Sequence, residues 1–250
     1  MQALRDRRGS MDNESLINEF KEWVKQSDNI VFFGGAGVST ESGIPDFRGV
    51  DGLYNQKYKY PPEQIISHSF YVSRPEEFFE FYKDKMIYTD AKPSTTHLQL
   101  AKLEEQGRLK GVITQNIDGL HQMAGSRHVV ELHGSIHRNY CEKCGKFYGI
   151  DSIINAHGIP VCECGGRIKP DVVLYEEGLN QSDIEEAVRL IKSADMLIVG
   201  GTSLGVYPAA GLIRYYTGQK LVLINKSPTP FDTNADLLIH DSLGKVFGAL

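Results

Sequence analysis

The stretch Asn29-Ile-Val-Phe-Phe33-Gly34-Gly-Ala-Gly37 decides the fold class of this chain. A short apolar run that ends in glycines predicts a buried strand from which the backbone leaves through a tight turn. Glycines let the backbone approach a pyrophosphate closely, so a strand-to-glycine junction is typical of nucleotide sites. The segment from Gly35 matches the dinucleotide fingerprint at its first two glycines, with Thr40 in place of the third. Taken alone, it fits an ordinary strand-to-helix turn equally well.

Helical and strand patterns alternate along the rest of the chain. Amphipathic helices are predicted at Asn13 to Gln26 and Thr95 to Gln106, and Ser182-Asp-Ile-Glu185 has the capping-box form that begins another. Further strands are predicted at Gly111 to Thr114, Val129 to Leu132, Met196 to Val199 and Leu221 to Ile224. The alternation predicts an α/β fold, a Rossmann-like doubly wound parallel sheet.

Two segments interrupt this alternation, and we expect them to form a small inserted lobe. The first is aromatic and polar with a helix-like stretch from Pro75 to Met86, and the second contains all four cysteines. The expected division assigns 49–92 and 135–169 to the small lobe, 11–48, 93–134 and 170–250 to a discontinuous nucleotide-binding domain, and 1–10 to a tag or disordered extension.

The four cysteines are spaced Cys-x2-Cys-x17-Cys-x-Cys, as Cys141, Cys144, Cys162 and Cys164. Two close pairs separated by a hairpin-sized gap can converge on one tetrahedral ion, and Zn2+ is the usual occupant. Four thiolates leave no open position for water, so the predicted zinc is structural and the chemistry lies elsewhere.

Composition excludes several classes of function. With 27 basic and 32 acidic residues, the formal charge of −5 gives no global reason to bind nucleic acid or an anionic membrane. Met196 to Ile213 is uncharged but rich in glycine, so we interpret it as strand, loop and helix start rather than a membrane span. The polar N-terminus resembles no signal peptide, and a cytoplasmic location is expected.

The loop after the glycines continues as Gly43-Ile-Pro-Asp-Phe-Arg48, and with it the chain resembles the sirtuins, the NAD-dependent protein lysine deacylases. Three more segments share this resemblance: Thr114-Gln-Asn-Ile-Asp-Gly-Leu-His121, Glu131-Leu-His-Gly-Ser135 and Gly200-Gly-Thr-Ser-Leu204. The cysteine pairs stand where that family carries its zinc module, although many members have two residues between the second pair instead of one. The likeness covers essentially the whole chain from Met11 and is nearest to compact bacterial sirtuins.

The resemblance implies roles for three catalytic residues. His133 would be the general base, and imidazole suits that role because its pKa lies near neutrality. Asn116 would orient the ribose or a water, and Asp118 with Ile117 would receive the nicotinamide carboxamide. The implied NAD+ contacts are Ala36, Gly37, Thr40, Phe47, Arg48, Gln115, Asn116, Ile117, Asp118, Thr202, Ser203, Asn225 and Leu243. An aromatic at Phe47 could also shield a reactive ribosyl cation from water.

The reaction implied by the family consumes NAD+ as a co-substrate. The acyl oxygen of an acylated lysine attacks C1' of the nicotinamide ribose, nicotinamide leaves, and an alkylimidate forms. The 2'-hydroxyl then attacks that imidate carbon, and water completes the release of free lysine and 2'-O-acyl-ADP-ribose. The alternative is a module that binds NAD+ without deacylation: an ADP-ribosyltransferase, an NAD hydrolase or a nucleotide sensor.

The expected partner is an acylated-lysine protein or peptide, with no nucleic acid and no membrane. Lys169 to Glu177 resembles the family strand that pairs with the extended peptide, which suggests Val172, Val173, Gly205 and Tyr207 as substrate contacts. Sirtuins that prefer succinyl groups carry Tyr-x-x-Arg, whereas this chain has Tyr82-Lys-Asp-Lys85. Lysine lacks the bidentate fork of arginine, so acetyl and longer apolar acyl groups are predicted instead.

Overall fold

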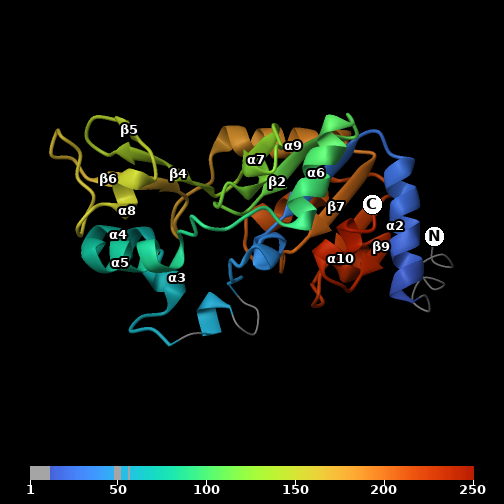
Figure 1. Cartoon of the computed structure of the whole chain (residues 1–250), viewed down its shortest axis with the longest axis horizontal. Helices are drawn as coiled ribbons and strands as arrows, with labels where there is room; N and C mark the ends of the chain where they lie inside the picture. Colours follow the sequence, from blue (N-terminus) through green and yellow to red (C-terminus); the bar gives the residue numbers. More distant parts are fainter. Residues whose placement is uncertain (1–11, 48–51, 56) are drawn as a thin grey trace.

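The computed structural model describes residues 12–47, 52–55 and 57–250, arranged as a large and a small lobe side by side along the long axis (Figure 1). Residues 1–10, which were predicted to be a tag or disordered extension, lie outside the described residues. The C-terminus lies in the large lobe, near the helix α2 (Asn13–Lys25). Within the described part of the chain, no helix is long and apolar enough to cross a membrane.

A six-stranded parallel sheet forms the large lobe, in the order β3-β2-β1-β7-β8-β9. Its strands are β1 (Ile30–Gly34), β2 (Leu109–Thr114), β3 (Val129–Glu131), β7 (Met196–Gly200), β8 (Leu221–Ile224) and β9 (Leu237–Ile239). Strand order runs outward from β1 in one direction and from β7 in the other. The sheet therefore has the predicted doubly wound form, with its topological switch point between these two strands.

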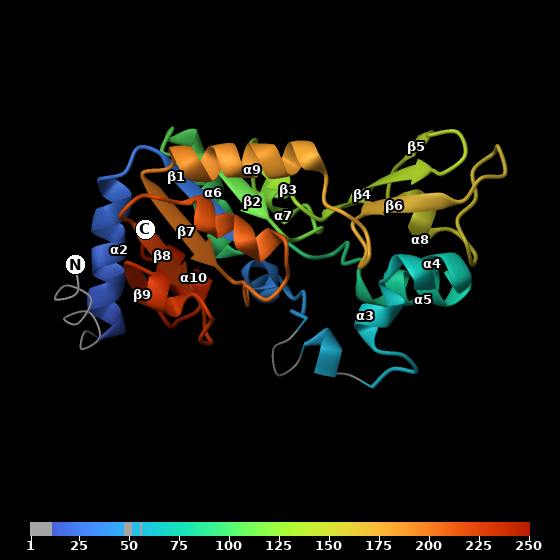
Figure 2. The same cartoon turned by 180° about the vertical axis from the view of Figure 1, so that it is seen from behind.

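Helices cover both faces of this sheet because alternate residues of each strand point to opposite sides. Phe32 belongs to a core shared with α2, α6 (Thr95–Glu105) and α10 (Leu243–Phe247). Phe33 belongs to a second core shared with α9 (Gln181–Ser193) and the 3-10 helix η4 (Ala209–Tyr215) (Figure 2). Burial on both faces explains why β1 is apolar throughout.

The small lobe combines a helical part with a three-stranded antiparallel sheet, in the order β5-β4-β6. The strands are β4 (Gly134–Cys141), β5 (Phe147–Tyr148) and β6 (Ile168–Val172). The helices are α3 (Pro62–Ile65), α4 (His68–Ser73), α5 (Pro75–Lys85) and α8 (Asp151–Ile154). A third core, rich in aromatic rings from α4 and α5, unites them with Cys141 and Cys162. We propose the predicted domain boundaries on this basis.

Three local features differ from the sequence predictions. The cap of α9 is Asn180, whose side chain accepts from the backbone of Ser182 and Asp183, so the capping box predicted at Ser182 is wrong. The glycine turn leads into two three-residue 3-10 turns, η1 (Ala36–Val38) and η2 (Thr40–Ser42), rather than into a helix. Strand β9 and helix α10 complete the sheet and one of its covering layers without having been predicted.

Candidate active site

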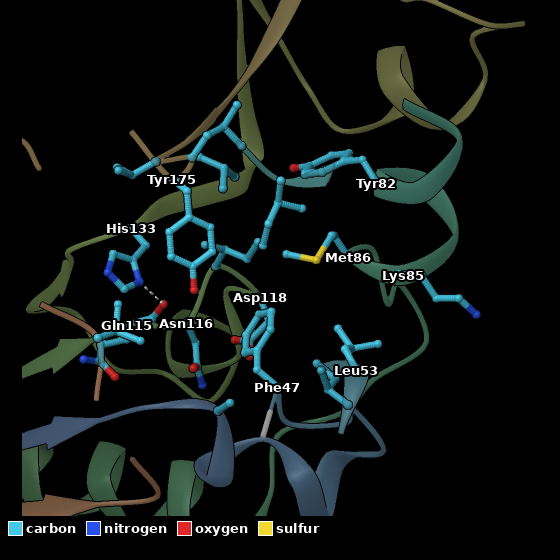
Figure 3. A pocket seen from close by; sticks show the side chains of 18 of the residues that line it. Phe47, Leu53, Tyr82, Lys85, Met86, Gln115, Asn116, Asp118, His133 and Tyr175 are labelled. Carbon is cyan, nitrogen blue, oxygen red and sulfur yellow. Dashed lines mark hydrogen bonds between the residues drawn. The ribbon is translucent and has the colours of Figure 1, made fainter. Parts of the chain in front are cut away.

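Two adjoining cavities open at the carboxyl ends of β1, β2 and β7, where ligands bind in doubly wound sheets. The first, of about 240 Å³, extends from His133 toward the small lobe (Figure 3). The second, of about 330 Å³, runs along the glycine loop to the start of α10. His133, Asn116, Gln115 and Phe47 line both, so the groups predicted to react lie where the two cavities meet.

The glycine loop packs tightly against the loop after β7. The Gly37 amide donates to the Gly201 carbonyl at 2.8 Å, and a Cβ at Gly37 would lie only 2.7 Å from Gly201 Cα. A side chain at Gly37 would therefore push the two loops apart. Glycine is required here for close approach, as the dinucleotide motif suggested.

The orientation of His133 leaves one ring nitrogen available in the cavity. Its Nδ1 lies 2.9 Å from the carbonyl oxygen of Gln115. A carbonyl can only accept, so Nδ1 carries the proton and Nε2 has the free lone pair. Burial lowers the pKa of His133, which favours the neutral form that a base requires.

Ser39 joins the two other predicted catalytic residues. Its hydroxyl donates to Asp118 Oδ2 at 2.6 Å and accepts from Asn116 Nδ2 at 3.1 Å. The other carboxylate oxygen of Asp118 accepts from the Leu120 amide at 2.9 Å, at the start of α7 (Leu120–Met123). Strand β2 ends at Thr114, so Asn116 and Asp118 lie beyond the strand, and the serine of the glycine loop connects their side chains.

Gln115, Thr202 and Asn225 form a second network beneath the other cavity. The Thr202 hydroxyl donates to Gln115 Oε1 at 2.9 Å, and the Asn225 amide makes two bonds to the Thr202 backbone, at 3.0 and 3.1 Å. Asn225 therefore fixes the loop after β7, which leaves one of its N-H groups for a ribose hydroxyl.

The described cavity residues include nearly all of the predicted site. Those that line one or both cavities are Ala36, Gly37, Thr40, Phe47, Gln115, Asn116, Ile117, Asp118, His133, Val172, Val173, Thr202, Ser203, Tyr207, Asn225 and Leu243. Gly205 does not line either cavity, although its neighbours Val206 and Tyr207 do. Arg48 lies outside the described residues.

Sequence reasoning missed three residues of this site. Ser39 lies in the glycine loop, between Gly37 and Thr40, but was given no role. Tyr54 and Tyr175 both line the first cavity, and their hydroxyls lie 2.8 Å apart, which links the segment after Phe47 to the chain after β6. Hydroxyl pairs between segments distant in sequence leave no spacing signal, so only the fold reveals them.

Two buried histidines beneath the site make its stability sensitive to acid. The rings of His97 and His121 lie 4.6 Å apart and both are almost fully buried. Burial lowers the pKa of His97 to about 4 and that of His121 well below 6.5. Below pH 6.5 both histidines take up protons in the unfolded chain, whereas in the folded chain they remain neutral. The free energy of unfolding is therefore highest above that pH and decreases below it.

We expect the free energy of unfolding to fall by up to about 1.4 kcal/mol per pH unit for each of these histidines between pH 6.5 and about 4. Urea unfolding across this range measures the slope. His121→Phe should make the slope shallower, whereas His157→Ala, at an exposed position, should leave it unchanged. An unchanged slope in His121→Phe would contradict the assignment.

The four cysteine sulfurs converge as a zinc site requires. They all lie within 4.8 Å of one another, with Cys141 and Cys164 at 3.4 Å and Cys144 and Cys162 at 3.7 Å. Four sulfurs at about 2.3 Å from a tetrahedral ion are separated by roughly 3.8 Å, so the cluster fits Zn2+.

The two glycines after Cys162-Glu-Cys164 form the tight turn that this short cysteine pair requires. Gly165 has a left-handed φ of 80°, and the Cys162 amide donates to the Gly166 carbonyl at 2.8 Å. A Cβ at Gly166 would lie 2.6 Å from Cys141 Sγ. Glycines thus make room for a pair that has one intervening residue instead of two.

Comparisons with known proteins agree with this geometry. The family model described as "Sir2 family" matches residues 35–208. The chain is 62% identical over 234 residues to an NAD-dependent protein deacetylase of Clostridium acetobutylicum, which covers 92% of this chain and 96% of that protein. Among solved structures, a Sir2 variant with a deacetylated p53 peptide and 3'-O-acetyl ADP ribose has a TM-score of 0.85 at 41% identity, covering 93% of this chain and 96% of that one. A Sir2 complex with p53 peptide and NAD+ has a TM-score of 0.81 at 41% identity, with the same coverage.

Proposed function

The chain belongs to the Sir2 family, whose motifs the sequence resembled, and from that premise we propose that it is an NAD-dependent protein lysine deacetylase. NAD+ is its co-substrate, and one structural zinc ion holds the small lobe. The observation that carries the proposal is the lone pair of His133 Nε2 at the junction of the two cavities. A protein that only binds nucleotide has no need of a base there.

We assign the two cavities to the two substrates. The second cavity would take the adenosine and phosphates of NAD+, since the glycine loop and the Thr202 loop form its walls. The nicotinamide would lie against Asn116 and Asp118, whose side chains Ser39 fixes. The acyl-lysine would enter the first cavity from the peptide side, so that its carbonyl oxygen meets the ribose near His133.

The substrate peptide would extend across the mouth of the first cavity. The Val173 amide donates to the His133 carbonyl at 3.0 Å, which ties the proposed peptide strand to the proposed base. Val206 and Tyr207, from the loop after β7, line the same cavity. An extended peptide between these two segments can pair through its main chain, which gives affinity with little demand on sequence.

The test of this function is peptide-dependent consumption of NAD+. Incubation with NAD+ and an acetyl-lysine peptide should release nicotinamide, free lysine peptide and O-acetyl-ADP-ribose in equal amounts, measured by mass spectrometry. Nicotinamide release without deacetylated peptide would instead support an NAD hydrolase or ADP-ribosyltransferase. The zinc thiolates must remain reduced, so we also propose a reducing compartment, the cytoplasm.

The inner end of the first cavity favours small apolar acyl groups. Leu53, Met86 and Tyr82 line it, and Tyr82 is fully buried. Lys85 also lines the cavity, but its ammonium group lies 3.0 Å from Asp84 and is directed away from the other labelled side chains (Figure 3). A succinyl carboxylate entering this end would lose its water without gaining a bidentate partner, which is unfavourable.

We therefore expect kcat/KM for acetyl and propionyl peptides to exceed that for the succinyl peptide by about tenfold or more. Lys85→Arg supplies a planar fork and should raise the succinyl-to-acetyl ratio, whereas Lys83→Arg, on the same helix, should not. Comparable rates for acetyl and succinyl peptides in the unaltered protein would refute this preference.

A further inference from the structure

Tyr207 is an exposed aromatic residue that is nonetheless held in place at the rim of the first cavity. Its side chain is 57% exposed, which is unusual for an ordered ring beside a substrate cavity. The ring lies over Gly211 of η4, where a Cβ would be 3.6 Å from two ring atoms. The Tyr207 ring therefore packs against η4 at Gly211, where a Cβ would make an ordinary van der Waals contact with it.

Arg214 makes cation–π contacts with this ring and with the ring of Phe231. Its guanidinium carbon is 6.0 Å from the Tyr207 ring centre and 5.6 Å from that of Phe231. Nη2 donates a long bond of 3.4 Å to the Tyr207 hydroxyl. Stacking of this kind fixes the plane of a guanidinium while leaving its N-H edge open.

The charge of Arg214 is not neutralised within the described part of the chain. No ion pair joins it to a carboxylate among residues 12–47, 52–55 and 57–250, whereas Arg74, Arg138 and Arg189 all have such partners. Arginine carries five N-H donors, and Tyr207 takes one. An ordered guanidinium with free donors is prepared to bind a carboxylate through two parallel hydrogen bonds.

Glu176 and Glu177, two acidic residues that line the first cavity, already have polar partners. Glu176 accepts from the amide and hydroxyl of Ser69, at 2.8 and 2.9 Å. Glu177 pairs with His68 at 2.9 Å and with Lys169 at 3.2 Å. Because these two carboxylates already have partners, they have fewer free acceptor positions for a basic side chain of a bound peptide. We therefore expect Arg214 to contribute more to the selection of peptides by charge.

Given the proposed function, we propose that Arg214, stacked on Tyr207, is a specificity-determining residue that recognises an acidic side chain flanking the acyl-lysine of the substrate. The main-chain pairing described above is indifferent to sequence. A carboxylate that reaches over the Tyr207 ring to the free edge of Arg214 would add both orientation and charge selection.

The experiment uses acetyl-lysine peptides that differ at a single flanking position, which carries Glu, Gln or Lys in turn. At one position we expect Glu to be favoured over Lys by about threefold to tenfold in kcat/KM, the range for a partly exposed ion pair with arginine. The effect should appear in KM rather than kcat, because the contact is remote from the reacting atoms. In Arg214→Glu the preference at that position should reverse.

Lys192→Glu is the matched control, since it makes the same charge change on the neighbouring helix α9. Lys192 lies over Tyr215, which does not line either cavity. Reversing the charge of Lys192 should therefore leave the preference for Glu over Lys peptides unaltered. Binding of fluorescein-labelled peptides, followed by anisotropy, tests the same preference without turnover and keeps the inference separate from the proposed reaction. Equal affinity for Glu and Lys peptides at every position, or a preference that survives in Arg214→Glu, would overturn it.

Discussion

Replacing His133 with alanine is expected to reduce deacetylation by about 10²–10⁴-fold, the usual contribution of a positioned general base. The ring holds its proton on Nδ1 through the bond to Gln115, so Nε2 is left to accept one from the ribose hydroxyls. Alanine removes that acceptor but little of either cavity wall. The measurement is kcat for free-lysine peptide formation at saturating NAD+ and peptide.

A second readout separates loss of the base from loss of structure. Departure of nicotinamide precedes the base-dependent step, so exchange of labelled nicotinamide into NAD+ should fall much less than deacetylation in His133→Ala. His157→Ala, an exposed histidine of the small lobe, should retain both activities. Full deacetylation by the His133 variant would contradict the role proposed for this residue.

The same residue sets the acid limb of the pH profile. Only neutral imidazole can accept a proton, and burial lowers the pKa of His133 from its usual value of 6.5. In the free enzyme, the acid limb of kcat/KM should therefore lie at lower pH than expected for an imidazole of ordinary pKa. Acid unfolding through His97 and His121 begins in the same range, so the profile must be restricted to pH values at which the protein remains folded.

The architecture was predictable because its signals are local. Each predicted strand of the large sheet corresponds to one in the structure, since strands buried on both faces appear in sequence as continuous apolar runs. The cap of α9 was misplaced because Ser182-Asp-Ile-Glu185 and Asn180 both satisfy local capping rules. Only the fold shows which oxygen accepts from the amides at the helix start.

The resemblance led to residues that line the two cavities, but it could not give the contacts between them. The resemblance to the sirtuins pointed to Asn116 and Asp118, yet their common partner is Ser39, which is 77 residues from Asn116 in sequence. Arg214 lies in none of the quoted motifs. Its proposed role in specificity depends on its contacts with the rings of Tyr207 and Phe231. Contacts of this kind join residues that are far apart in the sequence. They therefore leave no recognisable spacing in a single sequence.

Removing zinc is expected to abolish deacetylation by unfolding the small lobe, although none of the four cysteines lines either cavity. Cys141 ends β4 and Cys162 is buried in the same aromatic core as α4 and α5. Without the ion, four thiolates that lie within 4.8 Å of one another would repel or become protonated, and the sheet that they close would lose its anchor. Strand β4 begins immediately after His133, so disorder in the lobe reaches the base directly.

The test variant is Cys162→Ser, and the control is Glu163→Ala, at the exposed residue between Cys162 and Cys164. Glu163 forms only a surface ion pair with Lys146, which contributes little to stability. The serine variant should lose zinc, measured by elemental analysis, and lose the cooperative thermal transition of the small lobe together with peptide turnover. The Glu163 variant should retain one zinc ion per chain and full activity. Because the ion acts only through folding, adding zinc back to chelated protein should restore activity only as the lobe refolds. Deacetylation that persists after verified removal of zinc would show that the cysteine cluster does not support the cleft.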